Sequence, residues 1–99
     1  MDDLSVETFS PHVGAEFLIA DPPNGGPVTL TLTEIRRLGR QPAAPRVEPF
    51  SLLFCGPPGP ILAQRIYRLE HPGLGALDVF LVPVGYDETG ASCYEAVFN

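Results

Sequence analysis

Short runs of β-favouring residues, separated by glycine and proline, divide the chain into six predicted strands. The clearest pair comprises residues 66–70 and 77–82, which are rich in β-branched, aromatic and other apolar side chains. Residues 71–74 (HPGL) lie between them and predict a type II turn, with Gly73 at the position that requires a positive φ. Gly75 is then placed to form a bulge that restores pairing. We therefore predict a long antiparallel hairpin over Ile66–Gly85, around which the rest of the fold is built.

The second arm of this hairpin is apolar on both faces, a pattern typical of a central strand that is covered on both sides. Pro83 has no backbone N–H to donate to a neighbouring strand, so the arm is expected to end, or to become an edge, near this residue.

The remaining strands are expected at residues 16–20, 28–33, 50–55 and 92–98, the second with a possible extension to residue 38. A single helical turn is expected over Thr8–Gly14, where Phe9 and Val13 stand four residues apart and both face the barrel to plug one end. The segment Gly39–Glu48 has two prolines and few apolar anchors, and we expect a mobile loop there.

Six short antiparallel strands and one helical turn predict an all-β fold, a small six-stranded antiparallel barrel or roll. One domain is expected over residues 1–99, with strand spacings typical of a meander. The side chains expected to point inward are Phe17, Ile19, Leu30, Leu32, Leu52, Phe54, Ile66, Val79, Leu81 and Phe98.

Charge narrows the classes of partner. The net charge is −6, which disfavours nucleic acid and anionic membranes. All six basic residues are arginines between Arg36 and Arg68, and the cluster Arg36, Arg37 and Arg40 suits either a carboxylate-rich partner or a solvated rim. The acidic N-terminus does not resemble a signal peptide, and no apolar run is long enough to span a membrane, so a cytoplasmic location is expected.

No catalytic or metal-binding motif is evident. The possible metal ligands His12, His71, Cys55 and Cys93 are scattered singly along the chain, so neither a metal site nor a cofactor is expected. Each cysteine lies in an apolar strand, where free cysteine packs as a small hydrophobe, and a disulfide is not expected in a cytosolic chain. The three tyrosines (Tyr67, Tyr86 and Tyr94) are expected to close barrel ends and edges with their hydroxyls in water.

Several segments resemble a family of short bacterial proteins classed as a domain of unknown function. They include Thr8-Phe9 with Gly14, Pro49-Phe50-Ser51 with Phe54, residues 67–72 (YRLEHP), residues 81–83 (LVP) and residues 94–98 (YEAVF), so the resemblance covers nearly the whole chain. The family carries no assigned activity. The resemblance also suggests an association with tail-collar-like fibre proteins of phage-derived systems.

These observations favour a non-enzymatic protein-interaction or assembly module. The last strand has an apolar end that a second subunit could cover, which makes Tyr94 and Phe98 candidate contact residues beside the arginine cluster. One alternative is an accessory protein of phage-derived tail-fibre-like assemblies, in which the arginines dock an acidic partner. The other is a small-ligand-binding barrel or an enzyme that uses His71, Tyr67 and Glu70 at the barrel mouth.

Overall fold

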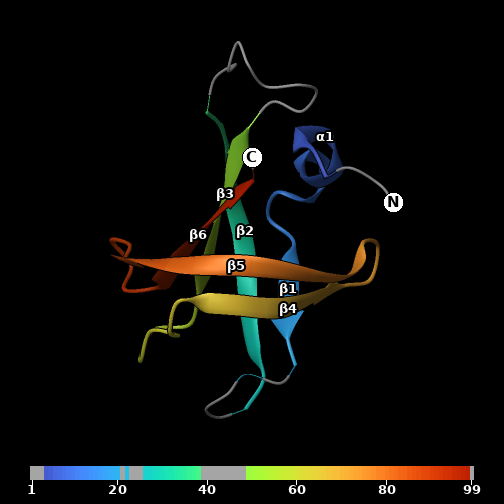
Figure 1. Cartoon of the computed structure of the whole chain (residues 1–99). Coiled ribbons are helices and arrows are strands. Elements are labelled where there is room, and N and C mark those ends of the chain that lie inside the picture. The colour runs from blue at the N-terminus through green and yellow to red at the C-terminus, as the bar shows by residue number, and fades with distance from the viewer. Residues whose placement is uncertain (1–3, 21, 23–25, 39–48, 99) are drawn as a thin grey trace.

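A computed structural model describes residues 4–20, 22, 26–38 and 49–98 of the chain. Two short helices precede six strands: α1 (Val6–Phe9), η1 (Ser10–His12), β1 (Glu16–Ile19), β2 (Val28–Arg37), β3 (Phe50–Gly56), β4 (Arg65–His71), β5 (Gly75–Tyr86) and β6 (Ser92–Phe98). Figure 1 shows the strands wrapped around a common interior, with α1 beside the end of the sheet where β3 and β6 meet. Neither helix is long and apolar enough to cross a membrane. The segment predicted to be a mobile loop, Gly39–Glu48, lies outside the described residues.

The six strands form a closed antiparallel barrel in the order β1-β2-β3-β6-β5-β4, which confirms the predicted fold class. Closure occurs between β1 and β4, where Leu18 pairs with Glu70. The order is not that of a simple meander, because β3 pairs with β6 and the chain crosses one end of the barrel to reach β4. The last strand therefore lies between two others.

The barrel interior is filled with side chains that alternate along the strands. Eight of the ten residues predicted to point inward are buried: Phe17, Ile19, Leu30, Leu32, Leu52, Phe54, Val79 and Leu81. Phe98 is half-buried and packs against the edge of this core. The prediction for Ile66 was wrong, because β4 turns Tyr67 and Leu69 inward and leaves Ile66 outside.

The turn of the central hairpin differs from the prediction. The positive φ lies at Gly75 (76°) and not at Gly73, and pairing begins at His71–Gly75 with no register shift, so the expected bulge is not formed there. The second arm does not end at Pro83 but becomes an edge toward β4 near this residue, as the second option of the prediction had it. Pairing with β4 ends at Leu81, and pairing with β6 runs from Val82 to Tyr86 with a register shift between Pro83 and Gly85.

The N-terminal helices close one end of the barrel through a single aromatic side chain. Phe9 is fully buried, and its ring lies 6.1 Å from Phe50 and 5.7 Å from Phe98. Val13 was predicted to share this role but is exposed, because the chain has left helical geometry at that residue (ψ 128°). Helix α1 begins earlier than predicted, with Ser5 as its N-cap residue.

The crossover between β3 and β4 is held in place by tyrosine hydroxyls. Tyr94 Oη accepts a hydrogen bond from the Leu62 amide (2.9 Å), Tyr67 Oη donates to the Ala63 carbonyl (2.6 Å), and Tyr86 Oη donates to the Gly59 carbonyl (2.8 Å). The prediction that the hydroxyls point into water was therefore wrong for Tyr67 and Tyr94, which are buried, whereas Tyr86 is exposed as expected. Each satisfies a backbone group of a segment that has no strand neighbours of its own.

Candidate functional site

The predicted arginine cluster is only partly described. Arg36 Nη2 lies 3.0 Å from Glu34 Oε2, and Arg37 Nη2 lies 3.8 Å from Glu7 Oε2, with all four side chains largely exposed. Arg40 lies outside the described residues. Since neighbouring carboxylates already balance both described arginines, docking of an acidic partner here remains a prediction with no added structural support.

The two candidate contact residues of the last strand pack within the molecule itself. Tyr94 is 1% exposed and points into the core. Phe98 stacks on Phe50 with ring centroids 4.9 Å apart and an interplanar angle of 5°. β6 has β3 beside it along its whole length and β5 beside residues 92–95, and Phe9 packs against Phe98. Beyond Glu95 the described ladder pairs β6 with β3 alone, so coverage of this end by a second subunit stays a prediction.

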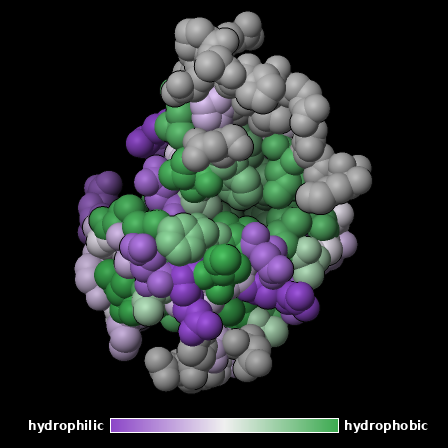
Figure 2. Space-filling model, in the orientation of Figure 1, coloured by the Kyte–Doolittle hydropathy of each residue, from purple (hydrophilic) through white to green (hydrophobic). Residues whose placement is uncertain are grey.

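The outer side of β4, β5 and β6 carries apolar side chains that are exposed, although Ile66 was predicted to point inward and β5 to be covered on both sides. Ile66 and Phe80 are directly opposite each other in the β4–β5 ladder and are 62% and 48% exposed. Val84 on β5 and Val97 on β6 are about half exposed as well. We call these four residues the outer apolar face. Figure 2 shows hydrophobic surface over the middle of β5 and β4, with hydrophilic surface beside it.

The sequence contains a signal for this outer apolar face. Ile66 has the same strand parity as Arg68 and Glu70, and Phe80 has the same parity as Asp78. Because successive strand residues point to opposite faces, a charged neighbour two residues away places both apolar side chains outside. The prediction that β5 is covered on both sides was therefore wrong.

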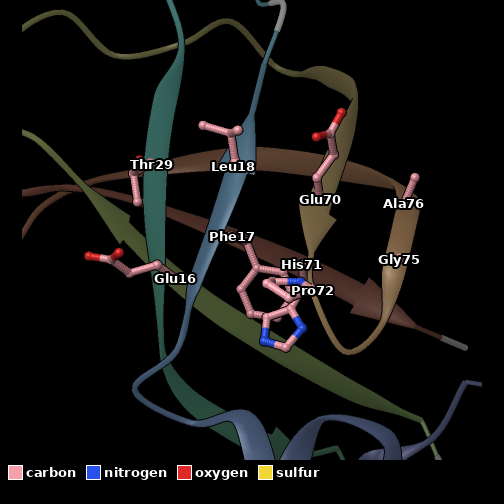
Figure 3. A pocket seen from close by; sticks show the side chains of 9 residues that line it. All are labelled: Glu16, Phe17, Leu18, Thr29, Glu70, His71, Pro72, Gly75 and Ala76. Carbon is pink, nitrogen blue, oxygen red and sulfur yellow. The ribbon is translucent and has the colours of Figure 1, made fainter.

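A second feature is an open groove of about 700 Å³ beside the β1–β4 seam. Its lining includes Phe17, His71, Glu16 and Glu70 (Figure 3). His71 Nδ1 accepts hydrogen bonds from the amides of Gly73 (2.9 Å) and Leu74 (3.2 Å), so the imidazole is fixed by the turn that follows it. Its ring also packs on Phe17 (4.8 Å) and, edge to face, on His12 (4.5 Å).

The groove brings the predicted chemical groups together only in part. His71 and Glu70 both line it, whereas Tyr67 lies in the core with its hydroxyl bound to the crossover. The carboxylates of Glu16 and Glu70 point away from the imidazole and away from each other (Figure 3). An acid–base pair requires hydrogen-bond reach between its members, and these side chains do not converge in that way.

The two cysteines, scattered in the sequence, are neighbours in the fold. Cys55 on β3 and Cys93 on β6 are direct partners in the ladder, with their Sγ atoms 2.6 Å apart. Ligand atoms of Cys55, Cys93 and Asp87 all lie within 4.8 Å of one another. The linear sequence did not reveal this proximity, because it depends on β3 pairing with β6.

Burial governs the ionisation of Cys93. It raises the pKa of the Cys93 thiol to about 12, and the adjacent Cys55 sulfur adds to the effect. Asp87 behaves in the opposite way: the Thr89 hydroxyl, followed by the Ala91 amide, donates to its carboxylate and lowers its pKa. Cys93 is therefore protonated at neutral pH and is a poor nucleophile as the free thiol.

The raised pKa of Cys93 predicts a loss of stability in alkali. Under reducing conditions the unfolded thiol loses its proton near pH 9, whereas the folded thiol keeps it until about pH 12. The folded state binds more protons across this interval, so the free energy of unfolding should fall as the pH rises through it. Urea titrations between pH 8 and pH 10.5 should show a shallower fall for Cys93→Ala than for the parent chain.

Tyr67 provides the control for that experiment. Burial also raises its pKa, so it contributes a fall of the same sign above pH 10. Tyr67→Phe should leave the change between pH 8 and pH 9.5 intact and reduce only the part at higher pH. Parallel profiles for Cys93→Ala and the parent chain would contradict the assignment to Cys93.

Comparison with known proteins identifies the family of the chain. The family model of the domain of unknown function DUF6916 matches residues 4–98. No curated protein and no solved structure matches the chain. The match extends across all six strands and both helices, so the resemblance to a family of short uncharacterised domains is confirmed. The chain therefore belongs to the DUF6916 family of domains of unknown function.

Proposed function

We propose that the protein is a non-enzymatic interaction module that assembles with a second copy of itself through the outer apolar face. The observation that carries this proposal is the exposed cross-strand pair Ile66–Phe80. The outward side of an antiparallel strand normally carries polar residues, and clustered exposed apolar side chains mark contact surfaces.

The side chains of the face suit burial against another protein. Phe80 supplies a large, rigid ring, and Ile66, Val84 and Val97 supply branched side chains with little rotamer freedom to lose. Burying one such side chain fully contributes about 1.5–3 kcal/mol. In a two-fold dimer every contribution counts twice, because the same patch is buried on both subunits.

Charges beside the face favour a second copy over an unrelated partner. Arg68 and Asp78 are the next outward pair along the ladder, with 3.5 Å between Arg68 Nε and Asp78 Oδ1 and both side chains well exposed. Because this pair carries one charge of each sign, a two-fold partner can place its Asp78 near Arg68 and its Arg68 near Asp78. At this pair a second copy therefore meets opposite charges, although the net charge of the chain is −6.

Binding is favoured over catalysis by the geometry of the alternative site. His71 uses Nδ1 to hold its own turn, and the two carboxylates of the groove point away from its ring. Tyr67, the third residue of the proposed small-ligand site, is engaged in the core.

The proposal predicts a concentration-dependent dimer. Light scattering on a sizing column, over a dilution series, should give twice the chain mass at high concentration. The double variant Ile66→Thr and Phe80→Thr keeps a β-favouring residue at both positions and should weaken the dimer at least 10-fold. Val13→Thr changes an equally exposed apolar residue outside the face and should leave the association unchanged.

The opposite results are equally informative. A parent chain that remains monomeric at every concentration would reject self-assembly and leave the face for a different protein. A dimer that the double variant retains, but that weakens when Arg36 and Arg37 are replaced, would move the interface to the arginine cluster and would favour the accessory-protein alternative.

A further inference from the structure

Cys55 and Cys93 are held face to face by the β3–β6 ladder. Their Sγ atoms are 2.6 Å apart and both thiols are free. We propose that this pair is a redox modification site, which a low-molecular-weight or protein disulfide converts into a reversible Cys55–Cys93 disulfide. The inference is independent of the proposed dimer, since neither cysteine belongs to the outer apolar face.

The backbone already has the spacing that the bond needs. Directly opposite residues in an antiparallel ladder have Cα atoms about 4.5–5.5 Å apart. Disulfides form across Cα separations of roughly 4.4–6.8 Å. Six further ladder partners, from Phe50–Phe98 to Gly56–Ser92, hold the two strands in the same register. Oxidation therefore requires only rotation of two side chains.

The geometry of the cysteine pair fits a disulfide better than a metal site. In a tetrahedral zinc site, Zn–S bonds of about 2.3 Å put two sulfurs about 3.8 Å apart, well beyond the separation found here. Asp87, the third possible ligand, already accepts hydrogen bonds at Oδ1 from the Thr89 amide, the Thr89 hydroxyl and the Ala91 amide. The turn thus uses the carboxylate to hold its own backbone.

The different exposure of the two thiols determines which of them reacts first with the oxidant. Cys55 is half-buried, whereas Cys93 is buried beneath the turn and its thiol donates to the Ala91 carbonyl (3.5 Å). The Cys55 thiolate attacks one sulfur of the oxidant RSSR, forming a mixed disulfide and releasing one thiolate, which takes up a proton as RSH. Cys93 then loses its proton, attacks the Cys55 sulfur and releases the second RSH. Two protein thiols are oxidised and one RSSR is reduced to two RSH.

Cys93 is suited to the second step and not to the first. Its raised pKa leaves little thiolate to react with an oxidant in solution. Once Cys55 carries the mixed disulfide, however, the attack becomes intramolecular, and proximity compensates for the low thiolate fraction.

The test is oxidation of the full chain with glutathione disulfide, followed by non-reducing mass spectrometry. The expected product has lost two hydrogens, carries no glutathione and has no thiol left for a maleimide. Trypsin should then release peptide 47–65, which contains Cys55, linked to peptide 69–99, which contains Cys93. Dithiothreitol should restore both thiols. The oxidised chain should melt roughly 10 °C or more above the reduced one.

Single variants keep the assignment falsifiable. Cys93→Ser should stop at the mixed disulfide on Cys55, and Cys55→Ser should react far more slowly because its remaining thiol is covered. Circular dichroism of each variant checks that the barrel is folded, with Cys→Ala as the substitute where serine is not tolerated. Two unreacted thiols, stable double glutathionylation, or stoichiometric zinc binding that protects both cysteines would each overturn the proposal.

Discussion

Phe54→Ala should lower the free energy of unfolding by about 3–5 kcal/mol, because truncating a fully buried aromatic residue leaves a cavity that a closed barrel cannot collapse to fill. Phe54 lies between Leu32 and Tyr94 in the ladder, and its ring meets Phe17 edge to face at 5.4 Å. In a chain of this size the melting temperature should drop by roughly 15–30 °C. Thermal and urea unfolding measure the effect.

The matched control is Phe80→Ala in dilute solution. It makes the same chemical change on the outside of the barrel, and should cost no more than about 1 kcal/mol because the ring is already half exposed. A double-mutant cycle with Phe17→Ala should also show a coupling of about 0.5–1.5 kcal/mol from the edge-to-face pair. Equal losses at positions 54 and 80 would contradict the inside–outside assignment.

Tyr94→Phe should lower the free energy of unfolding by about 1–3 kcal/mol although it removes a single oxygen atom. The Leu62 amide donates to that hydroxyl from a partly buried position, and without it the amide loses its acceptor. The loss is expected to affect the crossover between β3 and β4 first. Urea unfolding gives the total effect, and hydrogen exchange at the Leu62 amide should report a local increase in opening.

Tyr86→Phe is the control that tests whether burial of the hydrogen bond causes the loss of stability in Tyr94→Phe. Its hydroxyl donates to the Gly59 carbonyl in the same crossover, but at an exposed position where water can replace it. The expected loss is about 0.5 kcal/mol or less. If the two variants lost the same stability, the partial burial of the Leu62 amide would not be the cause of the effect at position 94.

The sequence was sufficient to locate the strands but not to predict which strands pair with each other. Runs of β-favouring residues between glycine and proline located all six, and β6 was predicted with the bounds it has in the structure. The register within a hairpin is local, and the β4–β5 pair was expected. That β3 pairs with β6 is a property of the whole closed sheet, and no local pattern specifies it.

The same limit explains which candidate sites could be predicted from the sequence and which could not. The Cys55–Cys93 pair depends on the non-local ladder between β3 and β6, so the sequence presented only two isolated thiols. The outward direction of Ile66 and Phe80 follows from the alternation of side chains along each strand, so it was predictable from the sequence. Ile66 was nevertheless predicted to lie in the core because it is hydrophobic. The tyrosine hydroxyls were misassigned because the unpaired amides and carbonyls they bind lie in a segment without regular structure.

The pairing of β3 with β6 also has a consequence for synthesis on the ribosome. Cys55 and its ladder partner Cys93 are 38 positions apart in the chain. At roughly 5–20 residues per second, β3 therefore emerges about 2–8 s before the strand that completes its second side. During this interval β2 can pair with one side of β3, while the other side presents unsatisfied amides and the apolar run Phe50–Phe54 to solvent or to a chaperone. The nascent chain, more than the finished barrel, is thus the form in which this domain is exposed to misassembly.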